Sequence, residues 1–263
     1  MNMGKSRRLS RIFREDKKTV IVPMDHGVTV GPVQGLKDMR SIINKLNIGG
    51  VDAILIHKGI AKNIDVGRVG LIIHMSGSTS IGPDPLWKCQ VCTVLEALKL
   101  GADAVSVHIN VGAPKEHEML MKFGKVSEEC EDLGVPLLAM MYPRGPTIKS
   151  EHAPEVVGHA VRLGAELGAD IVKTNYTGDL DSFREIISSC PVPVVIAGGP
   201  KTESVKEFLR MVYDSMKAGA SGISIGRNVF QHERPESMAK ALVAIVHEGA
   251  SVEKAVEIAS GKS

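Results

Sequence analysis

A single lysine, Lys173, lies near the end of an otherwise apolar stretch, LGADIVKTN (167–175). Alternate side chains of a β-strand share a face, so Lys173 is expected to point to the same side as Ile171. Burial disfavours the charged form of an amine, and a neutral amine can attack a ketone to form a Schiff base. The alternative is a structural lysine that pairs with an inward carboxylate such as Asp25.

Two other residues at the ends of apolar stretches could transfer protons beside this lysine. Tyr142 ends the stretch 135–142 and Asp25 ends the stretch 19–25. Schiff-base chemistry needs both a proton donor and a proton acceptor, and a phenol and a carboxylate can supply these roles. The alternative for Tyr142 is a hydrogen-bonded residue with only a structural role.

Two glycine-containing segments near the C-terminus, AGGPKTESV and IGRNVFQ, are typical of phosphate-binding loops. Glycines let backbone amides approach an anion closely, and a guanidinium adds a fork of donors. Gly198, Gly199, Gly226 and Arg227 are therefore expected to bind a phosphate. The alternative is that these glycines only form tight turns.

His57, His74 and His108 end apolar stretches and raise the possibility of a metal centre. The sequence contains no HExxH, so we favour hydrogen-bonding histidines and expect no metal. Cys89 and Cys92 form a lone CxxC without a second pair, and ordinary thiols are favoured over a redox role.

The stretch that carries Lys173 is one copy of a repeated phrase, in which a glycine and a small residue precede a short apolar strand. We expect eight strands, at 19–25, 49–57, 71–76, 100–108, 135–142, 167–175, 192–199 and 218–226, with helical patterns between most of them. Alternation of this kind predicts parallel pairing and an α/β (β/α)8 TIM barrel. An open doubly wound sheet is the alternative, but the first strand lacks a following GxGxxG. The segment 58–70, which connects the second and third expected strands, is too short and glycine-rich to predict a full helix.

The whole chain fits one barrel domain over residues 1–263, with 43% hydrophobic residues to build its core. Leu9, Ile12 and Phe13 have helical spacing and predict a capping helix over residues 1–18; contact of this basic arm with nucleic acid is the alternative. The 32 basic residues nearly balance the 30 acidic ones, so we expect no nucleic-acid or membrane partner. We expect a cytoplasmic protein, because no signal peptide or membrane span is recognisable.

Five motifs resemble the archaeal branch of the class I aldolase superfamily, which contains deoxyribose-phosphate and fructose-bisphosphate aldolases. They are VPMDHGVTVGP, MMYPRG, DIVKTNYTGD, VVIAGGPKT and GISIGRNVFQ, in this order over nearly the whole chain. The resemblance implies that Lys173 is the Schiff-base lysine, Tyr142 the proton donor and Asp25 the proton acceptor, without a cofactor. It also implies substrate contacts from His26, Gly27, Arg144, Gly198, Gly199, Gly226 and Arg227, and a homo-oligomer, specifically a decamer.

Two departures from the fructose-bisphosphate aldolase pattern narrow the expected reaction. Val28-Thr29-Val30 follows DHG where those aldolases tend to have a Glu-His pair, and Met140 replaces a tryptophan. The chain is more similar to the subgroup that moves a three-carbon unit from 6-deoxy-5-ketofructose 1-phosphate to L-aspartate 4-semialdehyde. That similarity implies 2-amino-3,7-dideoxy-D-threo-hept-6-ulosonate as product, on an alternative route to 3-dehydroquinate and the aromatic amino acids. A fructose-bisphosphate aldolase and a non-catalytic phosphate-binding barrel remain the alternatives.

Overall fold

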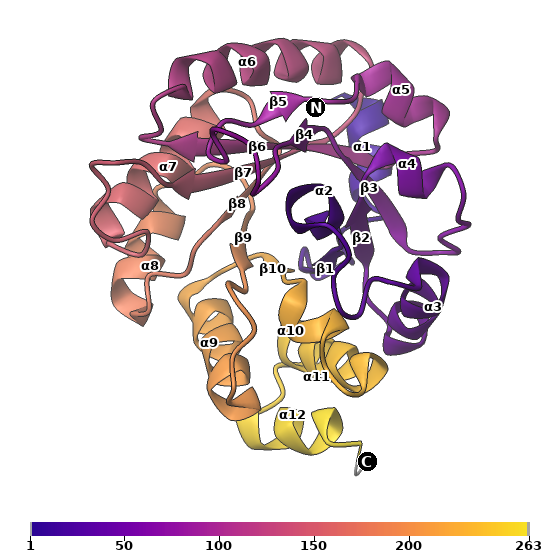
Figure 1. Ribbon diagram of the computed structural model, residues 1–263. Helices are drawn as coiled ribbons and strands as arrows, with labels where there is room; N and C mark the ends of the chain where they lie inside the picture. Colours follow the sequence, from indigo (N-terminus) through magenta and orange to yellow (C-terminus); the bar gives the residue numbers. More distant parts are fainter. Residues whose placement is uncertain (1, 262–263) are drawn as a thin grey trace.

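Eight parallel strands close into a barrel in the computed structural model, which describes residues 2–261 (Figure 1). The strands are β1 (Thr19–Pro23), β2 (Ala53–Ile56), β3 (Gly70–His74), β6 (Ala104–Val111), β7 (Leu137–Pro143), β8 (Ile171–Thr174), β9 (Val194–Ala197) and β10 (Gly222–Ser224). Each pairs with the next, and β10 closes on β1. The predicted TIM barrel is confirmed.

Helices surround this barrel, because each parallel strand needs a crossover to return the chain to the same end (Figure 1). The long ones are α3 (Met39–Gly49), α6 (Glu116–Asp132), α7 (Pro154–Glu166), α8 (Leu180–Ser188), α9 (Val205–Ala218), α11 (Pro235–Glu248) and α12 (Val252–Ala259). The short ones are α1 (Met3–Leu9), α2 (His26–Val30), α4 (Lys58–Ala61), α5 (Val94–Lys99) and α10 (Arg227–Phe230). The link 58–70 is indeed abbreviated, since α4 spans only four residues.

Alternation along the strands divides the apolar residues between two cores. Ile21, Leu55 and Ile171 belong to a core inside the barrel, whereas Val20 and Val172 belong to the larger core between the strands and the helices. Side chains two residues apart share a face, so Lys173 faces the barrel interior with Ile171.

The N-terminal segment fills the base of the barrel. Ile12 is fully buried in the inner core, and Leu9 and Phe13 pack against it. The capping helix is shorter than residues 1–18, however, because α1 ends at Leu9 and turns follow. Lys17 lies in the left-handed region at φ 62°, which a continuous helix cannot accommodate.

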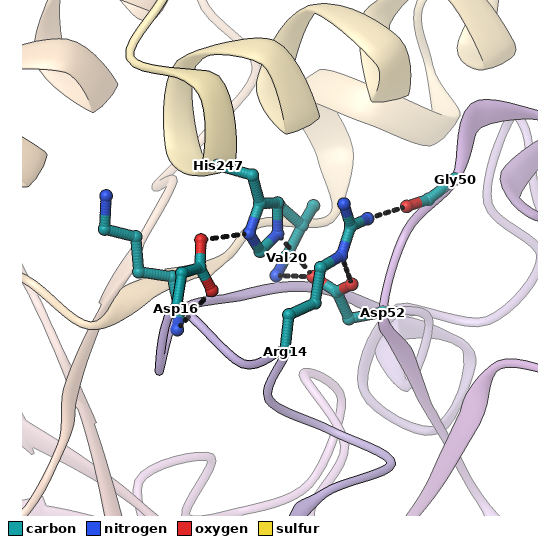
Figure 2. Close-up of polar contacts among 7 residues, drawn as sticks. Arg14, Asp16, Val20, Gly50, Asp52 and His247 are labelled. Atoms are coloured by element: carbon teal, nitrogen blue, oxygen red, sulfur yellow. Dashed lines mark hydrogen bonds and ion pairs between the residues drawn. The ribbon is translucent and has the colours of Figure 1, made fainter.

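A polar cluster joins this segment to the C-terminal half of the chain (Figure 2). The imidazole of His247 on α11 lies between two carboxylates, with Nδ1 2.8 Å from Asp16 and Nε2 2.9 Å from Asp52. Asp52 also accepts hydrogen bonds from the guanidinium of Arg14 and the backbone amide of Val20. Three separate parts of the chain, at residues 14–20, 52 and 247, therefore meet at this point.

Between β3 and β6 the chain makes an excursion that the sequence did not predict. It contains a small antiparallel pair, β4 (Ser76–Gly77) and β5 (Cys89–Gln90), which is separate from the barrel sheet. Throughout residues 2–261, no helix has the length and apolar character that crossing a membrane requires.

Candidate active site

A pocket of about 380 Å³ opens at the carboxyl ends of the strands. Most of the expected site residues line it: Asp25, His26, Tyr142, Arg144, Lys173, Gly198, Gly199, Gly226 and Arg227. Gly27 does not, because it lies on the exposed side of α2. Residues distant in sequence converge here because parallel strands present all their carboxyl ends at one rim.

Lys173 enters the pocket from β8 and is only 5% exposed. Its strand neighbour in register is Met140 on β7, and Tyr142 lies two residues further along that strand. Tyr142 is 6% exposed and belongs to the same inner core as Met140. The amine and the phenol therefore share the inner face of neighbouring strands.

Tyr142 is held by contacts on two sides. The ring of His108 meets it edge to face at a centroid distance of 5.0 Å, and the guanidinium of Arg144 lies 4.5 Å above its ring. Arg144 in turn donates a hydrogen bond of 2.8 Å to Glu151. Arg144 therefore orients the phenol while its own charge is balanced.

Asp25 follows β1 and lies among imidazoles. Its carboxylate oxygens are 3.6 Å from Nδ1 of His26 and 3.7 Å from Nε2 of His74. Burial opposes ionisation, but His74, His26 and Lys173 together hold the pKa of Asp25 well below its ordinary value. Asp25 is therefore a carboxylate at neutral pH, as a proton acceptor must be.

Two of the three predicted hydrogen-bonding histidines, His74 and His108, have partners in the pocket wall, whereas the ring of His57 meets that of His74 edge to face with centroids 5.2 Å apart. Nδ1 of His74 is 2.7 Å from the Ser106 hydroxyl, and Nε2 of His108 is 2.9 Å from Oδ1 of Asn110. Burial, opposed by Asp25, lowers the pKa of His74 to about 4, so its imidazole is neutral at pH 7. Within residues 2–261, no group of three or more His, Cys, Asp or Glu side chains is arranged to hold a metal ion.

The expected phosphate-binding residues lie together at the ends of β9 and β10. At Gly226 a Cβ atom would come within 2.5 Å of the Pro23 carbonyl oxygen, so only glycine fits. Buried Nε of Arg227 has no hydrogen-bond partner among the described residues. A buried guanidinium nitrogen without an acceptor is suited to an anionic ligand.

Asn228 fixes these two loops to each other, a role that the sequence did not reveal. Its Nδ2 donates to the carbonyl oxygens of Gly198 and Pro200 at 3.1 and 3.0 Å, and its Oδ1 accepts a hydrogen bond from the Thr202 amide at 2.9 Å. These hydrogen bonds hold the loops after β9 and β10 in a fixed arrangement relative to each other before any ligand binds.

Lys88 lines the pocket as well, although no strand pattern pointed to it. It lies in the middle of the excursion between β3 and β6, immediately before β5. The only feature of the sequence that could have pointed to Lys88 as a site residue is its position as the one lysine of a Gly-, Ser- and Pro-rich segment between a strand and a helix.

The cysteines near this segment are ordinary thiols in the structure. Cys89 and Cys92 are both free, and burial, with Glu96, raises the pKa of Cys92 to about 11. A thiol with such a pKa is a poor nucleophile at neutral pH, which favours the structural interpretation.

Comparisons with a family model and with known proteins both find aldolases and related synthases. The model of the "DeoC/LacD family aldolase" matches residues 19–232. A protein of Archaeoglobus fulgidus named 2-amino-3,7-dideoxy-D-threo-hept-6-ulosonate synthase 1 is 46% identical, over 97% of this chain and 95% of its own. A protein of Streptomyces griseus named 2-amino-4,5-dihydroxy-6-oxo-7-(phosphonooxy)heptanoate synthase is 42% identical, over 93% of this chain and 90% of its own.

Solved structures with the same architecture include an archaeal fructose 1,6-bisphosphate aldolase. It is 35% identical, covers 93% of this chain and all of its own, and superposes with a TM-score of 0.88. Another, at 34% identity and a TM-score of 0.86, is described as having its catalytic lysine covalently bound to the carbinolamine intermediate of the substrate.

Proposed function

Because the chain belongs to the DeoC/LacD family of aldolases, we propose that it catalyses a Schiff-base transaldol transfer. The donor is 6-deoxy-5-ketofructose 1-phosphate and the acceptor is L-aspartate 4-semialdehyde. The product is 2-amino-3,7-dideoxy-D-threo-hept-6-ulosonate, the compound in the name of the Archaeoglobus fulgidus relative that is 46% identical. The observation that carries the proposal is Lys173, an amine inside a barrel mouth beside a phenol and an ionised carboxylate.

Imine formation is the first step. The Nζ of Lys173 attacks the C5 ketone of the donor, water leaves, and a protonated imine results. This cation withdraws electrons from the adjacent C3–C4 bond. No group other than the imine is needed as the electron sink.

Cleavage and transfer then need one proton acceptor and one proton donor. As the C3 hydroxyl loses its proton to Asp25, the C3–C4 bond breaks, hydroxypyruvaldehyde phosphate leaves, and a three-carbon enamine stays on Lys173. The enamine carbon attacks the aldehyde of the acceptor while Tyr142 protonates its oxygen. Water then releases the product and restores the free amine, and Asp25 loses the proton that it accepted while Tyr142 regains one, so that both groups return to their starting states.

The anion-binding loops recognise the phosphorylated donor in this scheme. Gly198, Gly199 and Gly226 expose backbone near the pocket, and Arg227 supplies the charge. The Nε of Arg227, which has no partner among the described residues, and the hydrogen bonds of Asn228 to both loops support this role.

Borohydride reduction tests the assignment of the lysine. With donor present, reduction is expected to leave a stable adduct on a peptide that contains Lys173, and Lys173→Ala should abolish it. Lys88 is the other lysine among the residues that line the pocket, so Lys88→Ala is the matched control and should keep the adduct. An adduct at full yield in Lys173→Ala would refute the proposal.

The same experiment separates the alternatives. Fructose 1,6-bisphosphate should yield far less adduct and turnover than the proposed donor, whereas an aldolase would prefer it. A non-catalytic barrel would give no adduct with either sugar. Activity is also expected to survive EDTA, and a loss restored only by zinc would favour the histidine alternative.

A further inference from the structure

The excursion between β3 and β6 brings a further cation, Lys88, to the pocket that Arg144, Lys173 and Arg227 also line. Antiparallel pairing of Ser76 with Gln90 and of Gly77 with Cys89 holds the two ends of this segment together. Lys88 directly precedes this pair, and its Nζ donates a hydrogen bond to the Ser78 hydroxyl. Ser76, Ser78 and Lys88 all line the pocket.

Lys88 has no carboxylate within ion-pairing distance among the residues that the structure describes. Arg144, which also lines the pocket, is by contrast balanced, since it pairs with Glu151 at 2.8 Å. Burial and the nearby Arg144 lower the pKa of Lys88, with weaker opposition from Asp25 and Asp84. An anionic ligand would supply the missing counter-charge.

The order of strands in the closed barrel places Lys88 opposite the phosphate-binding loops. Around the ring the order is β1, β10, β9, β8, β7, β6, β3 and β2. In a ring of eight, β3 and β6 lie directly across from β9 and β10. The pocket therefore has Lys88 and Arg227 at opposite sides of its mouth, with Lys173 and the ion-paired Arg144 on the strands between them.

The proposed acceptor carries an anion that the loops after β9 and β10 do not account for. L-Aspartate 4-semialdehyde has a carboxylate three bonds from its aldehyde carbon. We propose that Lys88 binds this carboxylate and thereby selects the acceptor, an inference that rests on the proposed transaldol function. The hydroxyl of Ser76 accepts a hydrogen bond from the His108 amide, so its own hydrogen remains available as a further donor to the carboxylate.

A matched pair of acceptors tests this proposal. 3-Aminopropanal keeps the aldehyde and the amine of the semialdehyde and lacks only the carboxylate. Lys88→Gln should reduce the kcat/KM for the semialdehyde by roughly ten- to a hundredfold, because one charge-assisted contact is lost. The kcat/KM for 3-aminopropanal should change little. Lys88→Arg should retain most of the preference, and Lys115→Gln, an exposed lysine outside the pocket, is the matched control.

Equal losses with both acceptors, or an unchanged ratio, would overturn the role of Lys88. Failure of the proposed function is distinguishable, because wild-type protein would then form no borohydride adduct with the donor. Lys88→Gln should form that adduct at the wild-type yield, since imine formation precedes arrival of the acceptor. Loss of the adduct in this variant would mean that Lys88 acts on the donor instead and would also refute the proposal.

Discussion

The hydroxyl of Tyr142 is the group whose removal best separates imine formation from turnover. Tyr142→Phe keeps the ring that contacts His108 and Arg144, so little space is emptied. We expect the variant to form the Lys173 imine and to turn over about 10²–10⁴ times more slowly, as is typical when a general acid or base is lost. Borohydride trapping and steady-state kinetics measure the two effects separately. Wild-type turnover would mean that the phenol has only a structural role.

Arg227 tests the proposed phosphate site. Arg227→Ala should raise the half-saturation concentration of the donor by roughly ten- to a hundredfold, because a charge-assisted contact to phosphate is lost. The acceptor carries no phosphate, so the half-saturation concentration of the acceptor should change much less. A dephosphorylated donor should be a poor substrate of the wild type. Equal damage to both substrates would place the phosphate elsewhere on the rim.

The residues of the site were predictable where they end a strand. Alternation alone puts Lys173 on the inner face with Ile171, and the repeat puts Tyr142 and Asp25 at the same rim. Lys88 and Asn228 were not predictable in this way. Their positions depend on the course of an excursion and on hydrogen bonds between two loops, and neither leaves a periodic pattern in the sequence.

At the scale of elements, the sequence predicted the barrel strands well and the short pieces poorly. Each barrel strand places side chains in both cores and therefore consists of a continuous apolar run, which is recognisable in the sequence. The two-residue strands β4 and β5 are too short for any pattern, and their pairing joins residues separated by twelve or more positions. The N-terminal helix was predicted too long, because turns at 10–18 also bury Ile12.

Closure of the barrel depends on close contact between β10 and β1, which Gly222 allows. Its φ is 140°, and a Cβ atom there would lie 2.0 Å from the Thr19 carbonyl oxygen. Gly222→Ala should therefore lower the free energy of unfolding by about 2–4 kcal/mol through strain and displaced strands. Urea denaturation measures the change.

Gly124→Ala is the matched control for this substitution. Gly124 lies within α6 and a Cβ atom there meets nothing within 4 Å. This variant should be neutral or more stable by up to about 1 kcal/mol, because alanine favours a helix. Similar behaviour of the two variants would show that the closing contact tolerates a side chain.

At the scale of the whole molecule, His247 makes stability depend on pH. Burial opposes protonation, but hydrogen bonds to Asp52 and Asp16 raise the pKa of His247 above its ordinary value. A raised folded-state pKa adds stability that is complete below the unfolded value of about 6.5 and is lost as pH rises through the folded value. The wild type should therefore exceed His247→Gln in Tm by a few degrees near pH 6 and by less near pH 9.

Comparison of the two proteins at each pH isolates this histidine. His26, His57 and His74 have lowered pKa values and also make stability depend on pH, but they are present in both proteins. Thermal unfolding followed by circular dichroism gives the two curves. A difference in Tm that stays constant, or grows with pH, would contradict the raised pKa of His247.

The N-terminal segment that fills the base of the barrel is synthesised before the residues with which it pairs. Lys5 pairs with Glu131 and Asp170, and Asp16 with His247. During translation, the contacts at the base of the barrel therefore cannot all form until α11 has been synthesised. Until then Ile12 has no finished interior to enter, and it must be shielded as an apolar surface during translation.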